Sequence, residues 1–162
     1  MLKKLLPTFS LLLALVAGGP AWATGTPDAL VRQISTDVLN TAKADKAIQA
    51  GDINRIVAMV EEKVMPHVNF EVVTRSAVGP QWRGATPEQR SKLQAEFKIL
   101  LVRVYSGALT ELKDHTVEIT KTMPVAGSSQ VIVQSEVRGG SEPIKLDYRL
   151  DKPADAWKII DV

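Results

Sequence analysis

Few residues of this 162-residue chain have side chains suited to catalysis or metal binding, and they are widely separated. The two histidines, His67 and His115, are 48 positions apart, and neither adjoins a carboxylate cluster. A zinc site needs three or four converging ligands. Cysteine is absent, which excludes thiol nucleophiles, disulfides and thiolate metal ligands. We therefore predict neither a metal site nor a cofactor, and we interpret both histidines as structural or surface residues.

Carboxylates and one tyrosine offer the best case for catalysis. Glu61 and Glu62 are adjacent acids, but Lys63 follows them, and the group fits a solvated helix face. Tyr148 with Asp147 or Asp161 would suit acid–base chemistry inside a closed, curved sheet. Asp147, however, alternates with outward charged residues and should face water. The prediction is that the protein is not an enzyme, with acid–base catalysis kept as an alternative.

Overall charge gives no reason to expect nucleic-acid binding. The chain has 20 Lys+Arg against 18 Asp+Glu, and its pI is about 8.9. Lys3 and Lys4 lie in a segment expected to be removed, which leaves 18 basic and 18 acidic residues. The remaining aromatic residues stand at core-type positions rather than among basic runs. A hydrophobic fraction of 45% and this length indicate one globular domain.

The first 23 residues have the three-part pattern of a secretory signal peptide. A basic start precedes an apolar run from Leu5 to Val16, and Gly18-Gly19-Pro20 then breaks any helix. Ala21-Trp22-Ala23 supplies the small residues that signal peptidase recognises, so we expect cleavage after Ala23. A dozen apolar residues are too few to span a bilayer. The expected organisation is a signal peptide at 1–23 and a single exported domain at 24–162, which suits a bacterial periplasm.

The elements that position these residues are expected to be helices in the first half of the chain and strands in the second half. Helices are expected from near Pro27, after Gly51-Asp52, over 72–78, and from Thr86 to about Leu112. Thr86-Pro87-Glu88-Gln89 is a capping box with proline at the first helical position. The apolar stripe expected on the helix that follows consists of Leu93, Phe97, Leu100, Leu101, Val104, Tyr105 and Ala108.

From Thr116 onward the hydrophobic period changes to two, which indicates strands. Short turns at 124–129, Gly139-Gly140 and 153–155 separate four such runs, so we predict an antiparallel meander. Helices followed by a curved sheet of about four strands make an α+β fold, similar to an NTF2-like cone.

One long stretch carries a specific resemblance. Val60 to Leu109 reads VEEKVMPHVNFEVVTRSAVGPQWRGATPEQRSKLQAEFKILLVRVYSGAL. Its ordered set of Met65-Pro66-His67-Val68, Ala77-Val78-Gly79, Trp82, Ala85 to Arg90, Phe97, Leu101 and Tyr105 resembles the MlaC family of toluene-tolerance components in bacterial phospholipid transport. The closing 157–162 segment matches the family's last strand. Leu93, where the family usually has Phe, and Pro80, where a basic residue is common, depart from the pattern.

The resemblance implies a periplasmic carrier that shuttles a glycerophospholipid between an outer-membrane lipoprotein complex and an inner-membrane MCE/ABC transporter, maintaining lipid asymmetry. Family members continue past the last strand, so the family's C-terminal helices are expected to be missing from this sequence. A carrier of another lipid, such as a hopanoid, and an NTF2-like small-ligand enzyme remain alternatives. The apolar residues expected to line the lipid pocket, or else to fill the core, are Val73, Val78, Trp82, Phe97, Leu101, Tyr105, Val131, Val133, Val137, Leu146, Tyr148 and Trp157.

Overall fold

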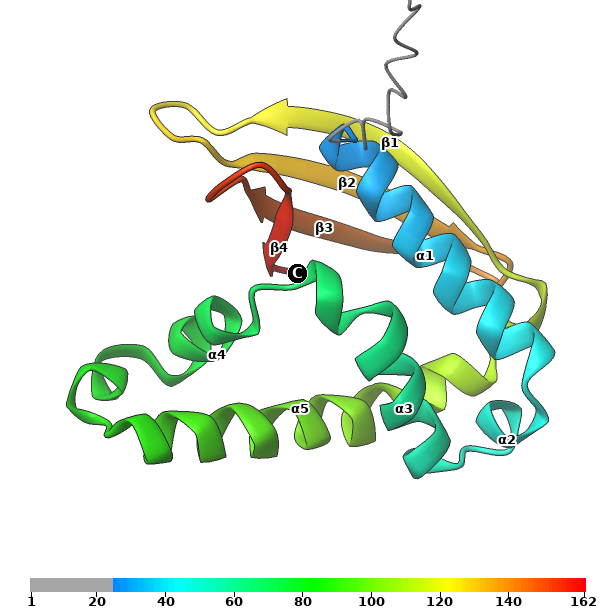
Figure 1. The fold of residues 1–162 in the computed structure, drawn as a ribbon. Helices are drawn as coiled ribbons and strands as arrows, with labels where there is room; N and C mark the ends of the chain where they lie inside the picture. Colours follow the sequence, from blue (N-terminus) through cyan, green and yellow to red (C-terminus); the bar gives the residue numbers. More distant parts are fainter. Residues whose placement is uncertain (1–24) are drawn as a thin grey trace, which may run out of the picture.

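The fold is α+β, as the sequence predicts: a helical half is followed by a four-stranded sheet (Figure 1). A computed structural model describes residues 25–162. The predicted signal peptide at 1–23 lies outside the described residues. No helix in the described part is long and apolar enough to cross a membrane.

Within residues 25–162, the helical half contains five α-helices and three short 3-10 helices. The α-helices are α1 (Pro27–Ala44), α2 (Lys46–Gln49), α3 (Ile53–Lys63), α4 (Phe70–Val78) and α5 (Pro87–Thr110). The 3-10 helices are η1 (Met65–His67), η2 (Gly79–Gly84) and η3 (Leu112–Asp114). The sequence did not predict α2, whose N-cap is Asp45: its carboxylate accepts from the backbone N–H groups of Ala47 and Ile48. Capping signals fix most of the other helix starts as well.

Two other starts show how local chemistry sets the helix boundaries. The Asp52 carboxylate accepts from the Asn54 and Arg55 backbone N–H groups and begins α3. At α5 the predicted capping box is complete, since Thr86 Oγ1 accepts from the Gln89 N–H and the Gln89 side chain accepts from the Thr86 N–H. These contacts satisfy donors that have no partner inside the helix.

The second half is the predicted antiparallel meander, with strand order β1-β2-β3-β4. The strands are β1 (Thr116–Pro124), β2 (Val131–Arg138), β3 (Ile144–Asp151) and β4 (Lys158–Asp161). Val133 pairs with Thr122 on one side and with Tyr148 on the other. The alternation predicted for β2 is confirmed, because its odd-numbered residues from 133 to 137 are buried.

One face of the sheet packs against α1, and together they form the first hydrophobic cluster (Figure 1). Val31 and Ile34 of α1 contact the buried sheet residues Val133, Leu150 and Ile159. Helical spacing on α1 and the two-residue period of the strands bring these side chains to one interface. We call this group the sheet cluster.

A second hydrophobic cluster joins the helices to one another. Its buried members are Ala42, Ile48, Ile56, Met59 and Val102. They come from α1, α2, α3 and α5, so the long helix α5 is attached to the rest of the molecule through α3 (Figure 1). We call this group the helical cluster.

The long helix α5 buries a residue outside the apolar stripe that the sequence predicts on it. Val102, outside the predicted stripe, is its buried apolar residue. Within the predicted stripe, Leu100 is 54% exposed and both Val104 and Tyr105 are 62% exposed. The sequence predicts an apolar stripe that either fills the core or lines a pocket; α3 covers the opposite side of the helix, so Leu100, Val104 and Tyr105 stay exposed.

Candidate functional site

The main candidate site is an open hollow between α4 and α5, with a volume of about 480 Å³. That volume lies within the range of about 300–1,000 Å³ typical of small-molecule sites. We call it the α4–α5 hollow. Its lining is mostly apolar and consists of Ala77, Val78, Leu93, Glu96, Phe97, Ile99, Leu100 and Arg103.

Exposed apolar side chains extend the α4–α5 hollow along α5. Six large hydrophobic residues of the described chain are exposed, and four of them are on this one helix. They are Leu93, Leu100, Val104 and Tyr105. Isolated exposed apolar residues are ordinary, but a run of them on one helix beside an apolar hollow marks a binding surface.

Two stacked aromatic rings join the helices that form the hollow. Phe70 begins α4, and its ring lies 5.8 Å from the ring of Phe97 on α5, with an interplanar angle of 24°. Thr74, one turn after Phe70, is fully buried, and its hydroxyl donates to the Phe70 carbonyl. The α4–α5 pair is therefore packed through its own side chains.

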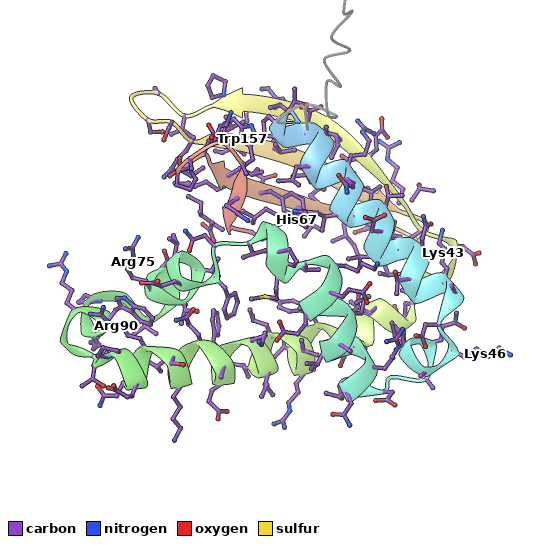
Figure 2. The ribbon with its side chains drawn as sticks, in the orientation of Figure 1. Lys43, Lys46, His67, Arg75, Arg90 and Trp157 are labelled. Carbon is purple, nitrogen blue, oxygen red and sulfur yellow. The ribbon has the colours of Figure 1, made fainter. Side chains whose placement is uncertain are left out.

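Two charged side chains, Glu96 and Arg103, also line the hollow. The Arg90 guanidinium lies over the ring of the buried Trp82, 5.4 Å from its centroid, and donates to the Arg83 carbonyl. Arg90 Nε is buried and has no hydrogen-bond partner among the described residues. Figure 2 places Arg90 and Arg75 at the same end of the molecule.

The residues considered for catalysis do not come together. Tyr148 packs into the sheet cluster, Asp147 is exposed as predicted and accepts from the Gln134 side chain, and Asp161 is exposed. The described residues contain no group of three or more side chains that could hold a metal ion.

His67 lies between the sheet and the helices (Figure 2). Burial lowers the pKa of its imidazole, the nearby Lys158 charge lowers it further, and Asp37 opposes the shift. These shifts come from burial and from one charged neighbour of each sign, so they describe His67 as a partly buried residue.

A second hollow, near the end of α1, is polar and carries no comparable argument. Its lining includes Asp45 and Arg55, which already bind each other, with Arg55 Nε 2.5 Å from Asp45 Oδ2. The Arg55 guanidinium lowers the pKa of the Asp45 carboxyl. A ligand here would have to compete with that ion pair.

The twelve residues predicted to line a pocket lie in separate places. Val78 and Phe97 line the α4–α5 hollow, while Val73 and Leu101 are half-buried on the same two helices. Trp82 is buried beneath Arg90, and Tyr105 is exposed. The other six are on the sheet side, where α1 covers one face of the sheet: Val131, Val133, Val137, Leu146, Tyr148 and Trp157.

Sequence reasoning did not select several residues of the site. Phe70 stacks on Phe97, and Leu93 and Leu100 line the hollow. A signal was available for the two leucines, because they lie four residues before and three residues after Phe97 on one helix face. No periodic signal in the short α4 distinguishes Phe70 from a core residue.

Known proteins resemble this chain over most of its length. The profile of a family described as MlaC protein matches residues 32–162. The intermembrane phospholipid transport system binding protein MlaC of Haemophilus influenzae is 23% identical over 146 residues, which are 88% of this chain and 68% of that protein. Toluene tolerance protein ttg2D of Pseudomonas putida is 25% identical over 154 residues, which are 93% of this chain and 72% of that protein.

One solved structure is similar to this chain in both fold and sequence. It is the phospholipid-binding protein from Ralstonia solanacearum, determined in complex with a phospholipid. The two structures have a TM-score of 0.78 and 36% sequence identity, over 83% of this chain and 75% of the other.

Proposed function

The chain belongs to the MlaC family, and from that premise we propose that it binds a glycerophospholipid and carries it across the periplasm. The proposal includes the family's route, between an outer-membrane lipoprotein complex and an inner-membrane ABC transporter, and export through the signal peptide at 1–23. The observation that carries the proposal is the α4–α5 hollow with its exposed apolar extension on α5.

The task of such a carrier is burial of hydrocarbon. Two acyl chains contain about 30 methylenes, and each costs about 0.8 kcal/mol in water, so more than about 20 kcal/mol opposes free diffusion of the lipid. A carrier must offer a comparably apolar surface to the chains. The side chains of Leu93, Phe97 and Leu100 offer such a surface, and the lining residues Glu96 and Arg103 offer charges to the polar headgroup.

Of the residues selected from the sequence, we propose that Val73, Val78, Phe97, Leu101 and Tyr105 contact the acyl chains from α4 and α5. The sheet residues and Trp82 are proposed as the more distant wall that positions these helices. Val133 supports this division, because it is fully buried in the sheet cluster with α1.

No observation favours an enzyme on this fold. Tyr148 points into a packed cluster and Asp161 is exposed, so the pair considered for acid–base work does not share a cavity. The solved relative supports lipid binding, since its structure contains a phospholipid. Transport direction and energy would come from the partners.

The test is extraction of gently purified protein with organic solvent, followed by mass spectrometry. We expect glycerophospholipid in a fixed ratio to protein. Protein that is repeatedly empty contradicts the carrier function, and a hopanoid in place of phospholipid supports the alternative carrier.

A substitution locates the site. Leu100→Asp places a charge in the α4–α5 hollow at a position that is 54% exposed. We expect bound lipid to fall several-fold while the free energy of unfolding falls by only about 1 kcal/mol, the sum of the lower helix propensity of Asp and its repulsion by Glu96 one turn earlier. Ile144→Asp is the matched control, because Ile144 is 48% exposed on β3 and does not line the hollow. Equal lipid content in the two variants would place the site elsewhere.

A further inference from the structure

Basic residues outnumber acids over the end of α4, the turn η2 and the start of α5. Between Val72 and Lys92 there are four basic residues, Arg75, Arg83, Arg90 and Lys92, against one acid, Glu88, and the acids Glu71 and Glu96 flank this stretch. From Gly25 onward the chain has equal numbers of basic and acidic residues. We call this region the basic end.

These cations are not used in the ion pairs found among residues 25–162. Those ion pairs use Arg55, Lys63, Lys98 and Arg138. Arg75, Arg83 and Lys92 are exposed. Arg90 is half-buried on Trp82, with its Nε unpaired in the described structure. The basic end therefore presents several hydrogen-bond donors that are not paired with acidic side chains in the ion pairs above. These donors can bind an anion outside the protein.

The basic end adjoins the mouth of the α4–α5 hollow. Arg75 precedes the lining residue Val78 by one helical turn, and Leu93 directly follows Lys92. Figure 2 shows Arg75 and Arg90 together at this end, with Lys43 and Lys46 at the opposite end. Positive charge beside exposed apolar side chains is the arrangement that binds an anionic lipid surface.

We propose that the basic end docks on the surface of an anionic phospholipid bilayer and holds the mouth of the hollow against the membrane. The partner of the basic end is thus the lipid surface itself. The role of this docking rests on the proposed carrier function, but docking and lipid content are measured separately.

The experiment is flotation of the protein with vesicles of phosphatidylcholine alone or of equal parts phosphatidylcholine and phosphatidylglycerol. We expect binding to the anionic vesicles only, and loss of binding as salt rises, because exposed charges are screened within about 8 Å at physiological ionic strength. Equal binding to both vesicles, or binding to neither, overturns the proposal. Binding to neither vesicle would point to an acidic protein as the partner of the basic end.

The variant Arg75→Gln/Arg83→Gln/Lys92→Gln removes three charges and leaves Arg90 on Trp82. Each basic side chain near an anionic leaflet strengthens binding by about fivefold, so we expect affinity to fall on the order of 100-fold. The control Arg32→Gln/Lys121→Gln/Lys145→Gln removes the same charge from exposed positions elsewhere. Equal weakening in both variants would show general charge attraction and overturn the assignment to the basic end.

Solvent extraction of the same preparations separates the two hypotheses. The triple variant should retain its lipid, because none of its three positions lines the hollow. Protein that docks on vesicles but never contains lipid contradicts the carrier function and supports the docking surface. Protein that contains lipid but does not dock contradicts only the docking surface.

Discussion

At Gly139 the β2–β3 turn passes too close to η3 for any other residue. Its φ is +143°, a conformation that L side chains rarely adopt. A Cβ there would lie 2.7 Å from the Cα of His115 and 2.8 Å from the carbonyl oxygen of Asp114. The predicted Gly139-Gly140 turn is confirmed, and the contact with His115 explains why the first glycine is required.

Gly139→Ala should lower the free energy of unfolding by about 2–3 kcal/mol or more, because backbone strain and a backbone clash act together. Gly127→Ala is the control, since Gly127 also has a positive φ, of +73°, but has open space around it. Its cost should be about 1 kcal/mol. Chemical denaturation of both variants measures the difference, and equal losses would mean that the clash relaxes without cost.

Residue identity predicted only part of the site. Phe97 was identified because it lies in a long helix with a clear apolar spacing, and it lines the hollow. Phe70 was not identified, since the face of α4 that meets α5 depends on the path of η2. The stacking of Phe70 on Phe97 is a tertiary contact, and neither local sequence encodes it.

Among the elements, α5 depends most visibly on its cap. Thr86→Ala removes the hydroxyl that accepts from the Gln89 N–H, so we expect a loss of about 1 kcal/mol in the free energy of unfolding. Thr26→Ala is the matched control: Thr26 is also an N-cap before proline, but its side chain makes no capping hydrogen bond. That change should stay within about 0.5 kcal/mol. Equal effects in thermal or urea unfolding would mean that the capping hydrogen bond contributes nothing.

The start of α5 was predictable and its packed face was not. Apolar residues occur on both sides of this helix, with Leu93 and Leu100 on one side and Val102 on the other. A helix that is apolar on more than one side has no single direction of burial in its sequence pattern. Val102 joins the helical cluster, while Leu93 and Leu100 line the hollow. One side attaches α5 to the fold, and the other is the side that we propose contacts the acyl chains.

Over the whole molecule, α1 takes part in both clusters, and a second junction of the two halves lies where η1 and the residues after it meet β4; we call this second junction the seam. Val68 pairs with Ile159 in a parallel bridge, and the Asn69 N–H donates to the Ile159 carbonyl at 2.8 Å. Lys158 Nζ donates to the Pro66 carbonyl from the same strand. The sequence predicts both halves of the fold from their periods, but this seam joins residues about 90 positions apart and has no local signal. His67 lies at the seam, so its pKa depends on the charges of the elements that meet there.

The position of His67 gives stability a definite dependence on pH. Burial and then Lys158 lower its pKa in the folded protein, so the unfolded chain takes up the proton first as pH falls. This contribution to stability is complete above the unfolded value of about 6.5 and is lost as pH falls through the lowered folded pKa. His67→Gln should therefore reduce the loss of stability on acidification below about pH 6.5, as measured by urea unfolding at a series of pH values.

Two neighbours test the cause with opposite signs. Lys158→Met should raise the pKa of His67 only in part, because burial is the larger cause, whereas Asp37→Asn should lower it further. NMR titration of the imidazole measures both shifts. If both variants moved the pKa in the same direction, the seam would have rearranged and the electrostatic account would be wrong. Opposite shifts would show that the charges of α1 and β4 act on one group between the sheet and the helices, which ties the acid stability of the molecule to the junction of its two halves.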